Sequence, residues 1–340
     1  MGQQPRRLGY AQPIGTTIRR SIWPYLAVLA LAGCSSRPPA RGKLVVAITV
    51  DWEGVELSPE GLDALDELRA RLGSAPVTHF VSAAYFTKEH PDPRAVSFVT
   101  EAVRPGDELA VHLHLWKSLA RASGVEPKLS PSYVTGTDKL YEFPDGDRGF
   151  DTDPDVYSVA ELRALIRASR TLLERTHIAV SRSFRAGGYL ATPKVLQAIR
   201  QDGYLVDSSA TDHRQLDPRK DVFLTRRVQE VWPKVNTITQ PFFADTQGQQ
   251  VLEMPITATA DYVTAADIAS AFQAAGERLQ KAPDRDVFVV LGCNQETAQD
   301  FAGRIAEAVE KLRGLAFADR LIFTTVEKAG ALARSAVPAQ

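Results

Sequence analysis

Cysteine is scarce in this chain, and neither sign of charge is in excess. The 340 residues include two cysteines, and 40 Lys+Arg stand against 41 Asp+Glu. Two thiols cannot build a disulfide scaffold or a four-thiolate zinc site, and a net charge of −1 does not favour a surface that coats nucleic acid. With 44% hydrophobic residues, the composition is typical of a globular protein rather than a disordered one.

A hydrophobic run long enough to cross a bilayer is also missing. The apolar stretch Ile22–Ala32 has about eleven residues, fewer than a membrane-spanning helix needs but enough for the hydrophobic region of a secretory signal. Arg19 and Arg20 precede it, as positive charge precedes such a region. The N-terminus therefore predicts export rather than a membrane span.

The end of this run resembles a bacterial lipobox, since Leu31-Ala32-Gly33 leads directly into Cys34. We expect a signal peptide over residues 1–33, acylation of the Cys34 thiol, and a tether over residues 34–42. The alternative is a buried helix that carries a cysteine by chance, which the polar, Pro-rich flanks disfavour. The mature protein is then an exported, membrane-anchored lipoprotein of the cell envelope, facing the periplasm or on the outer membrane where there is one.

Short β-branched runs alternate with helical patterns through residues 43–340. This alternation predicts a single α/β domain, a distorted (β/α) barrel of about seven to eight parallel strands. The expected strands are 44–50, 77–82, 108–112, 181–184, 204–206, 251–254, 287–291 and 321–324. The expected helices are 58–72, 93–103, 158–176, 192–201, 265–280, 298–315 and 326–334.

Two connections, residues 117–156 and 212–250, are long for this pattern and hold little clear periodicity. We expect both to cover one end of the sheet. In parallel α/β folds the site forms where the carboxyl ends of the strands meet these loops.

Three groups of polar residues follow predicted strands at that end. Asp51 and Glu53 come after the first strand, where they could enter a pocket or simply cap a helix. His112 and His114 are two residues apart on an extended segment, so both imidazoles can face a single cation. Arg185 precedes two glycines and has room for a bidentate contact with a carboxylate.

The order of these motifs resembles the polysaccharide deacetylase family, the NodB homology type of carbohydrate esterase family four. The resemblance rests on the segments Thr49–Asp51, Gly106–His112 and Phe184–Tyr189, with support from Thr78–Val81, Gly203–Ser209, Leu252–Pro255 and Phe323–Thr325. It covers about residues 43–335 and marks the chain as a divergent lipoprotein member. The family implies a distorted (β/α) barrel and metal-dependent removal of N- or O-acetyl groups from a glycan.

The resemblance assigns roles to matching positions. Asp51 matches the catalytic base, His112 matches the first metal ligand, and Arg185 matches the arginine that orients the base. Where the family has a second aspartate this chain has Trp52, so the oxygen ligand is Glu53 or Asp51. Where the family has its second histidine this chain has Trp116, so we expect His114 to take that place and zinc to be the metal.

The proton donor of the family is absent at its usual place. After the strand that ends near Leu291, Asn294 stands where the family has a histidine, and an amide cannot protonate a leaving group in that role. His213 or Glu296 is the expected substitute. The glycan is expected to contact Trp52, Trp116, Gly187 and Tyr189.

The sequence thus predicts a metal-dependent hydrolase that deacetylates a polysaccharide or a peptidoglycan-type glycan. The alternative is a catalytically impaired, surface-tethered glycan-binding lipoprotein of the same fold, because Trp52 and Asn294 both depart from the active set. A metal amidohydrolase fits less well, since that class places its paired histidines on the first strand, where this chain has Asp51. No nucleic-acid partner is expected, and no protein partner can be inferred.

Overall fold

The computed structural model describes residues 41–73, 75–217, 219–244, 251–314 and 317–336. The expected signal peptide, Cys34 and nearly all of the expected tether lie outside these residues. Over the described ranges, the helices are all too short or too polar to cross a membrane.

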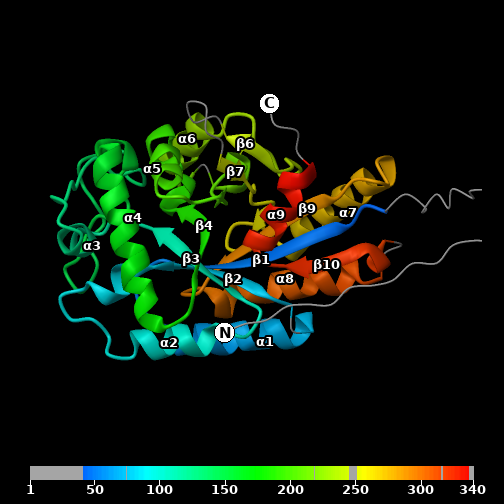
Figure 1. The fold of residues 1–340 in the computed structure, drawn as a ribbon, viewed down its shortest axis with the longest axis horizontal. Helices are drawn as coiled ribbons and strands as arrows, with labels where there is room; N and C mark the ends of the chain where they lie inside the picture. Colours follow the sequence, from blue (N-terminus) through cyan, green and yellow to red (C-terminus); the bar gives the residue numbers. More distant parts are fainter. Residues whose placement is uncertain (1–40, 74, 218, 245–250, 315–316, 337–340) are drawn as a thin grey trace, which may run out of the picture. The chain divides into compact units, whose positions relative to one another are not determined.

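One curled sheet, parallel except at one edge, organises the chain (Figure 1). Its strand order is β6 (Phe242–Ala244), β7 (Val251–Glu253), β5 (Val206–Asp207), β4 (Val180–Ala186), β3 (Glu108–Leu113), β2 (Val77–Ser82), β1 (Leu44–Trp52), β9 (Val287–Asn294) and β8 (Ala258–Thr259). β10 (Leu321–Thr324) pairs with β1, and the β6–β7 pair is antiparallel. The predicted distorted (β/α) barrel is confirmed, with an antiparallel edge that the sequence did not indicate.

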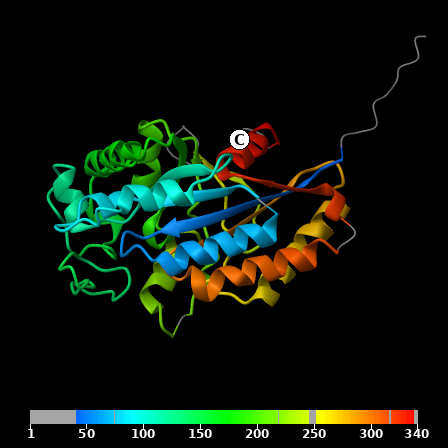
Figure 2. The ribbon, with the colours of Figure 1, turned by 90° about the horizontal axis from the view of Figure 1, so that it is seen from below.

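Helices cover the sheet. They are α1 (Pro59–Leu72), α2 (Ala95–Ala102), α3 (Lys117–Ala122), α4 (Val159–Leu173), α5 (Pro193–Gln201), α6 (Val222–Val231), α7 (Ala265–Lys281), α8 (Ala298–Leu312) and α9 (Val326–Ala336). α8 packs against both α1 and α7, which lie beside it on the same side of β1 in Figure 2.

Local sequence explains where these helices begin. The Ser58 hydroxyl accepts a hydrogen bond from the backbone N–H of Gly61 at 2.9 Å, and Pro59 follows at the first helical position, where its missing N–H costs nothing. Ser158 with Glu161 forms a capping box at α4, and α7 begins with another. The helix starts predicted from the sequence therefore lie within about two residues of the observed ones.

β1 is longer than predicted, and this changes the setting of the first acidic group. It continues to Trp52 because it pairs with β2 over Ile48–Trp52 and with β9 over Leu44–Asp51. Asp51 consequently lies within the strand, where residues alternate between the two faces. Thr49, Asp51 and Glu53 share one face, and Trp52 points to the other.

The two long connections hold more regular structure than the sequence indicated. α3 opens the first, and α6 and β6 lie in the second. These elements are short, and in α6 the fully buried residues are Leu224 and Val228, so the apolar pattern was too sparse to reveal them.

Candidate metal centre and catalytic carboxylate

β3 and the residue after its end place two imidazoles side by side. The rings of His112 and His114 are nearly perpendicular, with centroids 4.8 Å apart, and both residues are almost fully buried. Glu53 at the end of β1 reaches the same point. One ligand atom from each of the three residues lies within 4.8 Å of the others.

Backbone carbonyls determine which nitrogen of each ring faces Glu53. The Nδ1 atom of His112 lies 3.1 Å from the Arg185 carbonyl oxygen, and that of His114 lies 2.8 Å from the carbonyl oxygen of Phe150. A carbonyl only accepts, so each Nδ1 carries the proton and each Nε2 of a neutral ring presents a lone pair. This is how metal-binding histidines are commonly oriented.

The two Nε2 atoms converge on the carboxylate of Glu53. His112 Nε2 lies 3.3 Å from Glu53 Oε2, and His114 Nε2 contacts the same oxygen. In the neutral tautomer, His114 Nε2 is a buried acceptor without a hydrogen-bond donor. Lone pairs that face one another need a proton or a cation between them. Two imidazole nitrogens and one carboxylate oxygen are a ligand set that zinc accepts, so the residues fit the expected metal.

Electrostatics within this cluster show where a proton goes when no cation is bound. Burial raises the pKa of Glu53, but His114 and His112 outweigh it and hold that pKa well below its usual range. Burial lowers the pKa of His112, but the Glu53 carboxylate outweighs it and raises the pKa above its ordinary value. The carboxylate is therefore ionised and attracts positive charge, whether as imidazolium or as a metal ion.

A second carboxylate lies beside this cluster and is held by Arg185 of β4. The fully buried guanidinium donates from Nη1 to Asp51 Oδ1 at 2.7 Å and to the Thr49 hydroxyl at 2.8 Å. It also lies over the ring of Phe80, 4.2 Å from the centroid. The Asp51 charge contributes to the raised pKa of His112, so this carboxylate interacts electrostatically with the candidate metal site. The structure thus brings together Asp51, Arg185 and the three expected ligands.

Both tryptophans of the predicted glycan contact are fully buried. The Trp52 indole N–H donates to His79 Nδ1 at 3.2 Å, on the face of β1 that Asp51 does not share. The Trp116 indole N–H donates to the Glu53 backbone carbonyl at 3.0 Å. The Trp116 ring thus fixes the Glu53 backbone and the Trp52 ring packs on the opposite face of β1, so neither has surface to offer a sugar, and the predicted glycan contact of both is wrong.

Gly187 and Tyr189 are buried in the 3₁₀ helix η4 (Gly187–Tyr189), which directly follows β4. A Cβ on Gly187 would come within 2.6 Å of the His114 ring, so the close approach of that ring requires glycine. Tyr189 has a φ of 65°, a left-handed conformation that non-glycine residues adopt at a cost. Its pKa is raised well above its usual value, first by burial and then by Tyr262 and Asp51, so the phenol is neutral and close to the Asp51 carboxylate.

The two expected proton donors lie in different places. Glu296 follows β9, where its Oε1 accepts from the Tyr85 hydroxyl at 2.5 Å and from the Glu53 backbone N–H at 3.1 Å. Burial, with the nearby Glu53 charge, raises the pKa of Glu296 to about 8. His213 begins the 3₁₀ helix η5 (His213–Gln215), is half-buried, and lies outside the group that Glu53 forms with the two histidines. Asn294 ends β9 beside Asp51 in register.

Sequence reasoning missed the residues that support the histidines from the first long connection. The Phe150 ring stacks on His114 with centroids 4.0 Å apart and an angle of 3° between the planes. The ammonium of Lys88 lies 3.3 Å from the centre of the Trp116 ring and pairs with Asp145 and Asp147 at 3.3 and 3.2 Å. The density of aromatic and acidic residues in 117–156 was the available signal.

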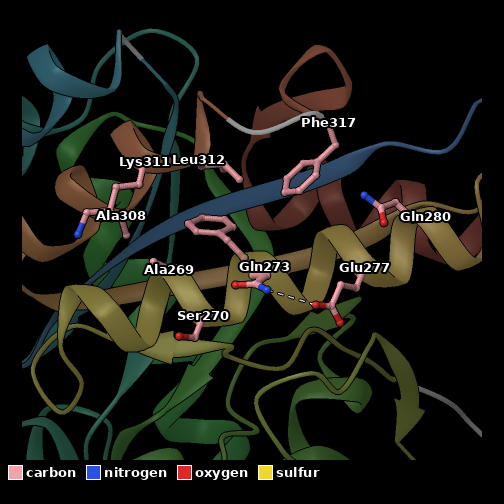
Figure 3. Close-up of a pocket in the computed structure, with 10 residues that line it drawn as sticks. Ala269, Ser270, Gln273, Glu277, Gln280, Ala308, Lys311, Leu312 and Phe317 are labelled. Atoms are coloured by element: carbon pink, nitrogen blue, oxygen red, sulfur yellow. Dashed lines mark hydrogen bonds between the residues drawn. The ribbon is translucent and has the colours of Figure 1, made fainter.

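Hollows elsewhere on the molecule lack this chemistry. Figure 3 shows a groove of about 540 Å³ between α7 and α8, lined by residues that include Gln273, Glu277, Lys311 and Phe317. Gln273 donates to Glu277 along one helix, and the group of possible metal ligands found among the described residues, Glu53 with His112 and His114, does not line this groove. The groove is formed by the helical layer and not by the carboxyl ends of the strands.

Comparisons with known proteins support the fold. No family model matches the sequence, and no curated protein sequence matches it. Among solved structures, a protein from Mycobacterium smegmatis with a provisional polysaccharide deacetylase assignment matches 89% of this chain and 95% of its own, at 12% identity and a TM-score of 0.52. A similarly assigned protein from Pseudomonas aeruginosa matches 88% and 93%, at 12% identity and a TM-score of 0.51.

The fold is not confined to deacetylases. The Puue allantoinase matches 91% of this chain and 97% of its own, at 12% identity and a TM-score of 0.52. The fold expected from the family resemblance is therefore confirmed, and the activity has to be argued from the site.

Proposed function

We propose that this protein is a zinc-dependent hydrolase that removes acetyl groups from a polysaccharide or a peptidoglycan-type glycan. The observation that carries the proposal is the meeting of two imidazole Nε2 atoms at one buried carboxylate oxygen, beside a second carboxylate held by an arginine. Hydrolysis of an amide or ester with metal assistance needs three metal ligands and an acid–base group, and a positively charged side chain such as arginine can orient that acid–base group.

Glu53, His112 and His114 would hold the metal. When bound, zinc supplies a Lewis acid that polarises a carbonyl group and makes a water molecule more acidic. Asp51 accepts the proton of the attacking water, and we assign this to Oδ2 because the guanidinium of Arg185 engages Oδ1. Arg185 is in turn held by the Ser208 carbonyl, so its position does not depend on Asp51 alone.

The leaving group takes its proton from His213 or Glu296. An amine leaves poorly without a proton, whereas an ester alkoxide depends on one less. Of His213→Ala and Glu296→Gln, the variant that removes the donor should lower turnover of an N-acetyl substrate by on the order of 10²–10⁴ and turnover of an O-acetyl substrate by much less. Equal losses on both substrates for both variants would contradict the assignment of either residue.

The test of the function measures acetate release by the purified mature domain, with zinc added, from acetylated chitooligosaccharides, peptidoglycan and acetylated xylan. Release that is abolished in Asp51→Asn supports the hydrolase. Zinc binding with no acetate from any glycan, but with retention on one of them, supports the impaired glycan-binding lipoprotein. Because the fold is shared with an allantoinase, ring opening of allantoin is a further arm.

We propose that the protein acts as an envelope lipoprotein anchored through Cys34. The lipobox-like segment before this residue supports the proposal. Metabolic labelling with a fatty acid should mark the wild type, and Cys34→Ser should lose the label and leave the membrane fraction. Label retained in Cys34→Ser would contradict the proposal.

A further inference from the structure

Two carboxyl groups that the proposed reaction does not use are buried next to each other under Arg185. Asp207 of β5 and Glu253 of β7 are register partners, and both are fully buried. Their outer oxygens, Asp207 Oδ2 and Glu253 Oε2, find no donor among the described residues. Register partners on neighbouring parallel strands point to the same face of the sheet, so the two carboxyl groups lie side by side.

The other oxygen of each carboxyl group accepts hydrogen bonds from the segment that follows β5. The Ser209 hydroxyl donates to Asp207 Oδ1 at 2.6 Å. The backbone N–H groups of Ser209 and Ala210 donate to Glu253 Oε1 at 3.1 and 2.9 Å. The pair therefore fixes the segment Ser208–Ala210.

The same segment holds the arginine of the candidate site. Arg185 donates from Nε to the Ser208 carbonyl oxygen at 2.6 Å and from Nη2 to the Ser208 hydroxyl at 2.9 Å. Its remaining nitrogen, Nη1, reaches Asp51 at 2.7 Å. A continuous set of hydrogen bonds thus runs from the carboxyl pair through this segment and the guanidinium to the Asp51 carboxylate.

Ionised carboxylates only accept hydrogen bonds, so two of them cannot bond to each other without a proton. Two negative charges in contact and away from water would also repel strongly. We propose that Asp207 and Glu253 share one proton, and that this pair is a positioning unit that fixes the Ser208–Ala210 segment, Arg185 and, through it, Asp51.

The charged groups around the pair are consistent with a shared proton that connects the two carboxyl groups. From β4, Arg185 is the charged side chain that acts on both carboxyl groups. α9 meets β5 through Gly330 against Val206, and its Arg334 donates to the Leu205 carbonyl. Burial raises the pKa of Asp207 to about 6 and raises that of Glu253 well above its usual value, in keeping with a proton kept at neutral pH.

The test uses the metal-free full domain and does not depend on any activity. A carboxyl group whose pKa is raised on folding binds a proton in the native state that the unfolded chain has lost, so stability falls as pH rises. Between about pH 6 and about pH 8, each pH unit should multiply the unfolding equilibrium constant of the wild type by some factor. That factor should be about ten times larger than the factor for Glu253→Gln. Glu277→Gln, an exposed carboxyl on α7, is the matched control and should keep the wild-type slope.

A second readout follows the position of Arg185 directly. Its Nε–H donates to a carbonyl in the interior, so this proton should exchange slowly with solvent in nuclear magnetic resonance spectra. Glu253→Ala should accelerate the exchange by about tenfold, and Glu253→Gln, whose amide can donate to Asp207, should restore it.

An unchanged pH slope in Glu253→Gln would overturn the shared proton. Slow Arg185 exchange in Glu253→Ala would overturn the positioning role. Asp207→Asn is the second variant, and since an amide in place of either carboxyl preserves the hydrogen bond, failure of both amide variants to fold would also contradict the proposal.

Discussion

Two acidic clusters lie at the same end of the sheet, and the negative charge of their carboxyl groups is compensated in different ways. Glu53 lies against two imidazoles whose Nδ1 atoms are committed to backbone carbonyls, so positive charge has to come from protons or a cation. Glu253 lies against Asp207 and needs only one proton. The first cluster has its lone pairs directed at a common point, and in the second each carboxyl group keeps one oxygen without a donor among the described residues.

This difference separates a cluster suited to binding a metal ion from a carboxyl pair suited to holding neighbouring residues in place. Imidazole and carboxylate lone pairs that converge are suited to a metal ion, because the carboxylate is already ionised and an imidazole can give up an Nε2 proton when the ion arrives. Paired carboxyl groups with raised pKa values keep their proton at neutral pH and stay neutral enough to remain buried. Arg185 and Asp51 connect the two clusters.

The largest effect on turnover is expected from a substitution of Asp51, which Arg185 connects to the carboxyl pair. Asp51→Asn should lower turnover by on the order of 10²–10⁴, because the amide cannot accept the proton of the attacking water. Zinc content should stay unchanged, since Asp51 is not one of the three ligands. Rates of acetate release and metal analysis check both points.

Asp66→Asn is the matched control for Asp51→Asn. Its side chain is 61% exposed and pairs with Arg104 on the surface, so turnover should be unchanged. Loss of zinc from Asp51→Asn would contradict the division of roles between base and ligands.

A smaller loss should follow from crowding one ligand without removing it. Gly187→Ala places a methyl group against the His114 ring and should weaken zinc binding by about 10–100-fold, the usual cost of disturbing the support of a ligand. The slope of stability with pH that we assign to the Asp207–Glu253 pair should not change. Gly303→Ala, where the nearest atom is 3.9 Å away, is the control that should bind zinc normally.

Proton competition should distinguish the metal cluster from the carboxyl pair. The raised pKa of His112 means that zinc has to displace a proton there, so zinc affinity should increase by up to about tenfold per pH unit as pH rises toward that raised pKa, and should level off above it. In the metal-free protein, the imidazolium–carboxylate attraction is present below the ordinary pKa of histidine and is lost as pH rises through the raised value. Calorimetric titration of zinc at several pH values measures this, and affinity independent of pH would contradict the assignment of His112.

The smallest effect is expected behind Glu53. Trp116→Phe removes the N–H that donates to the Glu53 carbonyl, which should cost about 1 kcal/mol of stability and lower zinc affinity by less than tenfold. Trp232→Phe removes a similar bond to the Tyr189 carbonyl and should cost similar stability with no change in zinc affinity. Equal zinc affinity in both variants would show that Trp116 does not help to position Glu53 for zinc binding.

The sequence predicted most of this fold because its strands are short apolar runs and its helices carry clear caps. β2 and β10 have the predicted bounds, with Pro76 just before β2 and Asp319 and Arg320 just before β10. β6 and β8 were missed, because strands of two or three residues have no measurable period, whereas the equally short β5 and β7 overlap the expected strands 204–206 and 251–254.

The site was predictable where spacing alone determines direction, as for His112 and His114 on one extended segment. The burial of Trp52 and Trp116 was not, because alternation along a strand does not tell which face will be covered. The Asp207–Glu253 pair was also beyond reach, since it depends on the register of two strands that are 46 residues apart.

Zinc binding by the purified mature domain tests the central claim most directly. We expect one zinc ion per wild-type chain, and none in a double variant of His112 and His114 to alanine that still folds. A wild-type chain that binds no zinc at neutral pH, with the fold intact, would contradict the account.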